Sequence, residues 1–473
     1  MAGQSDLIKV GGTANLAGTV VVDTMDGYKI NYDYTILTAE GGFNGTQFTD
    51  NTPAWNNVNN YAFVRPVISY DPTTVFLTVQ RNDVAFASVA ETPNQVAVAN
   101  ALETMGGSQS ELYEDVVLRL TAQEAPTVYN ALSGDIYASA QTVMINQTQH
   151  VRDAVTGRLQ QAFGGKPTTP VKAMGYAPSD DDAQMNGYYA EPESTYGAWG
   201  YAYGSWSELK GNSNTGKIKS DTGGFIAGFD GALSENWRVG ALAGYGYTSF
   251  DNDQNASGNA NAYTLGAYAG GQWDISDSTG WALRSGLAYT WNTPEVDRTV
   301  SFGSFYDQLN GSYDANTFQA FGEVAFQYQP ADQMQLEPYA NLSYVNLNNS
   351  SFNESGASAA ALGVHSDTMN TYFSTLGMRA STGFDIGTTK AEAYLDAGWR
   401  HAYGDIDPTS TAALTGSSPF TVSGVPVARD TAVIGVGMDF NVNEMTSIGL
   451  GYEGQFGDSY TQNSVTARLD IRF

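Results

Sequence analysis

The sequence predicts an all-β protein, in which a twelve-stranded antiparallel transmembrane β-barrel holds an α-helix in its pore and follows the end of a β-solenoid. Three observations lead to this prediction. Residues 195–473 contain twelve segments in which apolar and polar side chains alternate. The connections between these segments are short and long in turn. A polar helical segment at residues 139–163 precedes them. Alternating strands of roughly ten residues, even in number, are typical of barrels that span a membrane.

The composition excludes several classes of function. The chain has 473 residues, with 49 acidic against 21 basic residues and a net charge of −28, which argues against nucleic acid as a partner. It contains no cysteine, so we expect no disulfide and no cysteine–metal site, and we predict no cofactor. No run of about 18 apolar residues is present, which argues against a transmembrane helix. A signal peptide is also absent, so the chain is either cytosolic or, as the remaining patterns favour, part of a longer precursor.

The region before the barrel divides into a β part and a helical part. Residues 1–90 carry short apolar runs, such as YTILTA and VFLTVQ, between glycine-rich turns, which suits a solenoid end or a sandwich. Residues 91–138 are predicted to be helical. Thr92 and Gln95 form a capping box with Pro93 at the first helical position, and Pro126 and Gly134 mark helix breaks.

Each predicted barrel strand has one apolar face for lipid and one polar face for the lumen. In the first strand, Trp199, Tyr201 and Tyr203 are expected to face lipid. The last strand is expected to close against the first, with Val465 to Phe473 alternating toward lipid and Arg468, Asp470 and Arg472 toward the lumen. The charged residues expected to line the lumen are Asp230, Arg238, Arg284, Glu323, Glu337, Arg379, Glu392, Asp396, Arg400, Asp439, Glu453, Arg468 and Asp470.

The alternation of loop lengths predicts the direction of the barrel. Bacterial outer-membrane barrels have short periplasmic turns and long outer loops. We therefore expect DIGTTK and NVNEMT on the periplasmic side and the segment at 404–430 outside. An even number of strands places both ends of residues 195–473 on the periplasmic side. If residues 1–90 lie outside the cell, the chain must pass through the pore.

Residues 139–194 are predicted to be a pore-spanning helix followed by a periplasmic linker. A helix of about 25 residues spans roughly 37 Å, enough to cross the hydrocarbon layer. Its surface is largely polar, so we expect it to lie in a wet, polar tube. Because an unpaired charge away from water is costly, its charges should pair with the wall. The predicted pore residues are Asn146, Arg152, Asp153 and Arg158 on the helix and Glu323, Glu392, Asp396 and Arg400 on the wall.

Several segments, in this order, resemble the C-terminal part of a classical monomeric autotransporter (type V secretion), and the resemblance covers nearly the whole chain. YTILTAEGGFNG and FVRPVISYDPTTVFLTVQRN are similar to the junction that ends the β-helical passenger. ALSGDIYASAQTVMINQTQHVRDAVTGRL resembles the helical stretch that leads into the pore. YGAWGYAYGSW resembles the first barrel strand, and the terminal ARLDIRF resembles the outer-membrane assembly signal of the family.

The resemblance implies a translocator that secretes and displays an N-terminal passenger from the bacterial outer membrane, with the N-terminal region at the cell surface. It implies four domains: the passenger end (1–90), a helical segment (91–138), the pore helix with its linker (139–194) and the barrel (195–473). The implied partners are outer-membrane lipids and lipopolysaccharide, the barrel assembly machinery and the passenger itself. The implied oligomeric state is a monomer. The implied assembly signal comprises Val465, Leu469, Ile471 and Phe473.

Candidate catalytic residues are few, and we predict no enzymatic activity. His401 lies at the predicted outer rim with Asp405 nearby, but no nucleophile motif accompanies it. Some autotransporters cut their passenger inside the barrel by asparagine cyclisation, for which Asn146 is the candidate, with wall acids from the predicted pore residues. The adjacent asparagine pair of that motif is missing, so a hydrogen-bonding role is the simpler interpretation. The run Asp180–Asp182 could offer oxygen ligands to Ca²⁺, but a solvated linker is expected there.

Two other functions remain open from the sequence. A passive porin would also be a barrel with a polar lumen, but it needs neither the β segment nor the polar helix upstream. A surface adhesin would act through residues 1–90 and the outer loops. Conductance distinguishes the first alternative from a plugged translocator, and cell binding by residues 1–90 tests the second.

Overall fold

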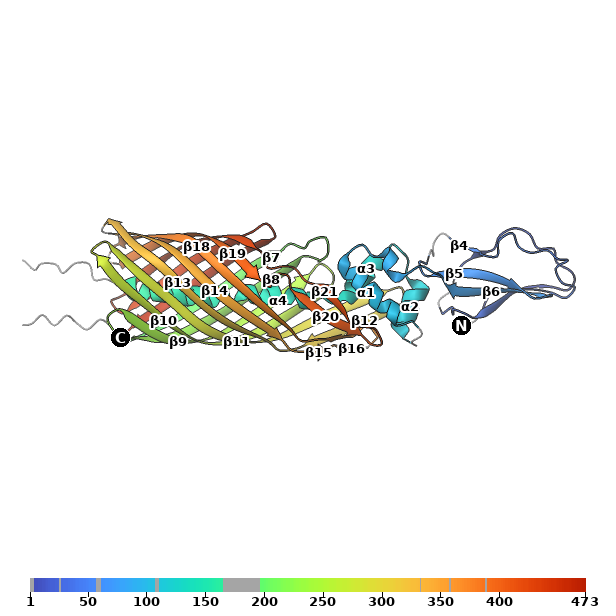
Figure 1. The fold of residues 1–473 in the computed structure, drawn as a ribbon, viewed down its shortest axis with the longest axis horizontal. Coiled ribbons are helices and arrows are strands. Elements are labelled where there is room, and N and C mark those ends of the chain that lie inside the picture. The colour runs from blue at the N-terminus through green and yellow to red at the C-terminus, as the bar shows by residue number, and fades with distance from the viewer. Residues whose placement is uncertain are drawn as a thin grey trace, which may run out of the picture.

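The structure, a computed structural model, describes residues 4–24, 27–56, 61–106, 110–164, 196–331, 333–356, 359–387 and 389–473. A β-barrel with a helix inside it forms the largest part (Figure 1). Helices α1–α3 lie beyond one end of the barrel, and strands β4–β6 lie beyond these helices, whereas the C-terminus lies at the opposite end. We call the barrel end beside α1–α3 the mouth and the other end the base.

The strands before the helices stack partly in parallel. One sheet has the order β1 (Ile8–Val10), β3 (Asp33–Ala39), β6 (Thr74–Arg81) and β5 (Val64–Tyr70), and a second pairs β2 (Val21–Val22) with β4 (Ala54–Trp55). The β1–β3 and β2–β4 pairs are parallel. Two successive stretches of chain therefore stack in register, which is typical of neighbouring coils of a solenoid.

Five α-helices and one 3₁₀ turn follow in the part of the chain that the structure describes. They are η1 (Phe86–Val89), α1 (Pro93–Thr104), α2 (Glu111–Arg119), α3 (Ala125–Ser133), α4 (Asp135–Gln147) and α5 (Gln149–Gly164). The predicted capping box is confirmed, because Thr92 and Gln95 bond reciprocally at the start of α1. Gly134 separates α3 from α4 with a φ of 63°, a left-handed conformation that favours glycine. Among the described residues, no helix is both long enough and apolar enough to cross a bilayer.

Twelve antiparallel strands close into the barrel, as predicted. Their order follows the chain except for the loop strands between them, and β24 pairs with β7 to complete the ring. They are β7 (Tyr196–Leu209), β8 (Ile218–Ala232), β9 (Trp237–Asn252), β10 (Ala256–Ser276), β11 (Thr279–Phe302), β13 (Ala315–Ala331), β14 (Met334–Asn349), β18 (Asp367–Ile386), β19 (Thr389–Gly404), β22 (Asp430–Asn441), β23 (Thr446–Phe456) and β24 (Tyr460–Arg472).

The closing strand has the predicted faces, but the first strand does not. Val465, Leu469, Ile471 and Phe473 are 40–57% exposed on the outer face, and the backbone of Phe473 exchanges two hydrogen bonds of 3.1 Å with Tyr196.

The lipid-facing prediction for Trp199, Tyr201 and Tyr203 is wrong, because all three face the lumen. Trp199 lies opposite Asp470, and both Trp199 and Tyr201 are buried. The small residues between them, such as Gly200 and Ala202, form the outer face of β7 instead. The lumen contains a helix that needs apolar partners on the wall, and this need turns the aromatic face inward.

The polarity of the wall inverts along the longest strand, β11. From Trp281 to Trp291 its outward residues are apolar or small. This stretch spans about ten residue steps, which at about 3.3 Å each and a tilt of roughly 40° rise about 25 Å, the height of a membrane band. From Thr293 to Ser301 the outward residues are polar or acidic, while Val296 and Val300 are fully buried on the inner side.

This inversion corrects the expectation of long loops at the mouth. Much of the segments at 292–313 and 404–430 forms strands: the outer half of β11, β12 (Phe305–Ser312), β20 (Thr409–Leu414) and β21 (Phe420–Ser423). The β14–β18 connection contains three short strands: β15 (Phe352–Asn353), β16 (Ser355–Gly356) and β17 (Leu362–Val364). The barrel continues beyond the membrane band as a wall with an apolar inner surface.

Candidate functional site

The lumen holds α5 in its base half and α4 in its mouth half. Helix α5 contacts the wall asymmetrically. Its apolar side faces β7–β11 and β13, and the contacts form one buried cluster. That cluster comprises Val151, Ala154, Val155 and Leu159 of the helix and Trp199, Tyr201, Ile226, Leu242, Tyr268, Ala288 and Phe321 of the wall.

Arg158 is the main polar attachment of α5 to the wall. Its Nε and one terminal nitrogen donate to Asp230 over 2.6 and 2.9 Å, and the other terminal nitrogen donates to Asp470 over 2.9 Å. Tyr268 donates a further hydrogen bond of 2.8 Å to Asp230, which also pairs with Arg238. The side chains of Arg158 and its two aspartates are at most 3% exposed, so this ion pair has little competition from water.

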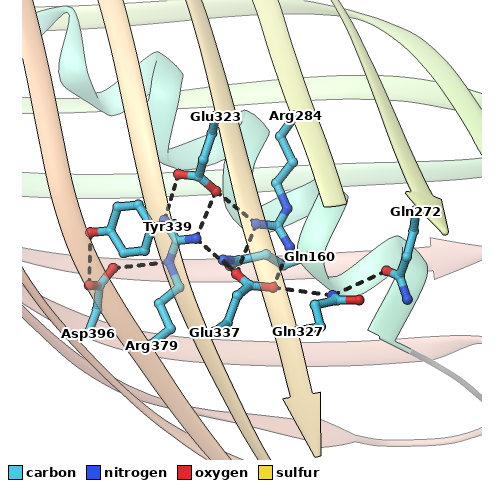
Figure 2. Close-up of polar contacts among 9 residues, drawn as sticks. All are labelled: Gln160, Gln272, Arg284, Glu323, Gln327, Glu337, Tyr339, Arg379 and Asp396. Carbon is cyan, nitrogen blue, oxygen red and sulfur yellow. Dashed lines mark hydrogen bonds and ion pairs between the residues drawn. The ribbon is translucent and has the colours of Figure 1, made fainter. Parts of the chain in front are cut away.

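A second charged network lines the opposite wall (Figure 2). Arg284 and Arg379 both bind Glu323 and Glu337 at 2.8–3.0 Å, and Arg379 also reaches Asp396 at 3.1 Å. The network joins β11, β13, β14, β18 and β19, and within the described residues its one hydrogen bond to α5 runs over 3.3 Å from Gln160 to Glu337. It therefore holds wall strands together more than it holds the helix.

Between α5 and the β14–β23 side of the wall lies a polar cavity of about 880 Å³, which we call the vestibule. It reaches the base, where the β22–β23 turn at 441–446 lines it. At its inner end Arg400 donates to Gln149 over 3.0 Å, while Arg152 donates to Thr148 and Gln319. The polar tube predicted from the sequence corresponds to this half of the lumen.

The mouth half of the lumen contradicts the polar tube. Every residue of α4 from Asp135 to Asn146 is buried. One apolar cluster runs without interruption from the solenoid-like strands through α1–α3 to α4 and the inner face of the mouth wall. Its members include Phe63, Phe86, Leu102, Leu112, Leu132, Ile136, Val143, Ile145, Val296, Val300, Leu309 and Val345. Polar residues of α4 bond the surrounding barrel: Ser139, Gln141 and Thr142 bond the β19–β22 connection, and Gln147 bonds Thr248 of β9.

One ion pair sits inside this apolar cluster, between Arg298 of β11 and Glu354 of the β14–β18 connection. The guanidinium and carboxylate form two hydrogen bonds of 2.9 and 2.6 Å. Arg298 also donates to the carbonyl oxygens of Ala131 in α3 and Ala360. Tyr137 of α4 donates to Glu354 over 2.7 Å. The pair therefore joins the wall to both α3 and α4.

The β19–β22 connection closes over α4. Val425 bonds the helix through both of its backbone groups: its amide donates to Ser139 over 3.0 Å and its carbonyl accepts from Thr142 over 2.6 Å. Gln141 donates to the carbonyl of Thr409 over 2.8 Å. A Cβ atom at Gly424 would overlap the backbone of Ser139, so only glycine permits this close approach.

Asp135, the first residue of α4, is a buried carboxyl group above the membrane band. The backbone amides of Ile136 and Gly216 donate to it, and Arg298 is the cation that faces it. Burial, together with the neighbouring Asp253 carboxylate, raises the pKa of Asp135 to about 7, against the opposing effect of Arg298. The protonated form of Asp135 is therefore favoured in the folded protein below about pH 7.

Asp135→Asn is expected to remove a pH dependence from the stability of the mouth. A carboxyl group whose pKa is raised on folding contributes stability that is lost as the pH rises from about 4 to about 7. Wild-type protein should therefore resist denaturant better at pH 5 than at pH 8, and the variant should be more stable than wild type at pH 8. Hydrogen exchange of α4 amides at both values measures this. The exposed Asp251→Asn is the control, and an unchanged wild-type pH profile in Asp135→Asn would refute the assignment.

The structure places the other predicted residues separately. Asn146 is buried in α4, and no hydrogen bond or ion pair within the described chain joins it to Glu323, Glu392 or Asp396. Glu392 and Asp153 line the vestibule. His401 accompanies Trp399 and Tyr403 on the outer face and bonds Asp430 at 2.6 Å. The Asp180–Asp182 run lies outside the described residues.

Comparisons with known proteins agree with this architecture. The family model described as "Autotransporter beta-domain" matches residues 198–453. A solved structure, the translocator domain of the autotransporter NalP from Neisseria meningitidis, superposes with a TM-score of 0.51 at 16% identity, covering 72% of this chain and all of that one. At this identity the likeness shows the fold alone.

Curated relatives are longer than this chain. An "Extracellular serine protease" of Serratia marcescens is 31% identical over 481 residues, which cover 93% of this chain and 43% of the relative. "Outer membrane protein B" of Rickettsia typhi is 21% identical, with 97% of this chain and 29% of the relative covered. The chain thus spans less than half the length of either relative.

Proposed function

Because the chain belongs to the autotransporter beta-domain family, we propose that it is an outer-membrane translocator that secretes an N-terminal passenger and displays it at the cell surface. The family places the barrel in the outer membrane. The passenger is the part that would precede this chain in a longer protein, as the partial coverage of the relatives suggests. We propose no catalytic activity for residues 1–473; the protease name belongs to a relative more than twice as long.

One observation carries this proposal: the chain runs through the closed barrel. β7 begins at the base, beside the C-terminal Phe473, and α5 and α4 fill the lumen, so the chain leads out at the mouth to α1–α3 and the solenoid-like strands (Figure 1). Short turns join strands at the base, and long connections lie at the mouth. Since outer-membrane barrels place short turns in the periplasm, the mouth faces outward.

The partners follow from the same assignment. The apolar outer band would contact outer-membrane lipid and lipopolysaccharide. The outward side chains of Val465, Leu469, Ile471 and Phe473 are accessible at the base, where the barrel assembly machinery could read them as an insertion signal. A single chain closes the barrel, which supports a monomer. A porin function is disfavoured, because α4 and α5 run through the lumen along its length.

An epitope insertion tests the orientation. Gly11 and Gly12 directly follow β1. A Cβ atom at either would meet nothing within 4 Å, so this is the place chosen for a short tag. The matched control is a tag at Gly387 in a base turn, which has equally open space. On intact cells an antibody should detect the first tag and not the second. Detection of only the second, or of neither before lysis, would contradict the proposal.

A further inference from the structure

An apolar hollow of about 730 Å³ lies on the outer surface of the barrel wall. It follows two neighbouring rows of cross-strand partners. One row runs through Ala269, Ser285, Gly322 and Leu342, and the other through Ala267, Leu287, Ala320, Tyr344, Tyr372 and Tyr403. Residues of α5 do not line the hollow. The side chains of Leu287, Leu342 and Tyr372, which line it, are 48–67% exposed. It therefore opens to the outside of the barrel.

The hollow has a floor of small residues between larger walls. At its centre, a Cβ atom at Gly322 would meet nothing within 4 Å. Alanines at 267, 269 and 320 extend this floor, while Val239, Leu287 and Leu342 stand at its sides. The volume falls within the roughly 300–1,000 Å³ range of small-molecule sites.

The two ends of the hollow differ in polarity. One end lies at Val239, near the start of β9 at the base. The other lies at Tyr403, near the end of β19 at the mouth, where Tyr403 and Ser374 share a hydrogen bond of 2.9 Å and Tyr344 donates to Asn370 over 2.8 Å. The hollow is thus continuous with the membrane-facing band and rises obliquely through it toward hydroxyl and amide groups.

We propose that this hollow binds one acyl chain of a lipopolysaccharide molecule in the outer leaflet, with the chain carbonyl at the tyrosines and the hydrocarbon along the Gly322 floor. The inference rests on the proposed function, because that function places the mouth at the outer leaflet. The apolar lining matches a hydrocarbon chain, and the polar groups at the mouth end match the ester and amide groups that join acyl chains to a sugar headgroup.

Gly322→Leu tests the site because it places a side chain on the floor of the hollow, at a position where a Cβ atom meets nothing within 4 Å. Gly200→Leu is the matched control: Gly200 also faces outward from a barrel strand, its Cβ position is equally open, and its strand β7 lies on another part of the ring than β13, which carries Gly322. The full chain is purified from outer membranes, incubated with lipid A in detergent, and examined by native mass spectrometry. Heat-modifiable migration on gels verifies that each variant is folded.

Wild type and Gly200→Leu are expected to retain one lipid A through detergent concentrations at which Gly322→Leu has lost it. Equal retention by all three proteins would overturn the proposal. So would equal retention of phosphatidylethanolamine by wild type, because the site would then not favour the outer-leaflet lipid. Surface display of the Gly11 tag is measured separately. A folded Gly322→Leu variant that still displays the tag would leave the translocator function intact whichever way lipid retention falls.

Discussion

Arg158→Met is expected to release α5 from the lumen wall. The substitution keeps much of the side-chain volume but leaves Asp470 without its guanidinium partner and removes two hydrogen bonds from Asp230. Removing one partner of a buried ion pair costs about 3–5 kcal/mol. The apolar contacts of α5 on the same wall would remain, so we expect a loosened helix in a barrel that still closes.

Hydrogen exchange of the α5 amides measures this effect in the membrane-embedded protein, because protection reports the free energy of local opening. In the variant, the amides of α5 should exchange far faster than in wild type, whereas the exchange rates of the barrel strands should be unchanged. Gln160→Met on the same helix is the control, since it loses only one hydrogen bond of 3.3 Å. Wild-type protection in Arg158→Met would mean that the apolar cluster alone holds the helix.

Glu354→Ala is expected to separate the helices from the mouth. It leaves Arg298 charged and buried, with side-chain exposure of only 3%, and it removes the acceptor of Tyr137. Removing one partner of a buried ion pair again costs about 3–5 kcal/mol. The opening free energy of α3 and α4 should fall by an amount of this order, because Arg298 and Glu354 bind Ala131 and Tyr137 in these helices.

A double variant separates charge from packing. Arg298→Met combined with Glu354→Leu removes both charges, and replacing a buried pair by apolar residues is far less harmful than breaking it. Limited proteolysis of the α3–α4 segment should therefore proceed fastest in Glu354→Ala and more slowly in the double variant. The exposed neighbour Asp297→Ala serves as the surface control. A double variant cleaved as fast as Glu354→Ala would show that the hydrogen bonds, and not the charge balance, hold the helices.

The barrel could be predicted from the sequence because its strands obey one local rule. Along β24 every second side chain from Val465 is apolar, and the residues between are polar or charged, so the faces follow from period two alone. The rule fails for β7, where Trp199 and Tyr201 alternate with glycine and alanine. Neither face carries a charge there, and the presence of α5 decides which one turns inward. An assignment of that strand needs the neighbouring helix, which the local pattern does not contain.

The candidate site was predictable only where charges stand out against their surroundings. Arg158 on a long helix indicates a partner on the wall, but its two aspartates are 72 and 312 residues away. The contact between Tyr137 and Glu354 joins positions 217 residues apart, and Glu354 lies in a connection of serine, alanine and asparagine that gives no local signal. The apolar surroundings of α4 could not be predicted for the same reason. In the sequence, the strands that bury α4 resemble polar loops, and their apolar residues form an inner face only in the folded barrel.

The most direct test of the central claim, that α4 and α5 occupy the lumen, is a disulfide between α5 and the wall. The chain has no cysteine of its own. A Cβ atom at Gly270 would lie 2.8 Å from a methyl carbon of Leu159, so the two positions adjoin each other, as a Cys–Cys bridge requires. Oxidised Leu159→Cys/Gly270→Cys protein in outer membranes should form one intramolecular disulfide, whereas Leu159→Cys/Gly200→Cys, whose second cysteine faces lipid, should not. A folded barrel in which the first pair stays reduced under oxidation would contradict the account.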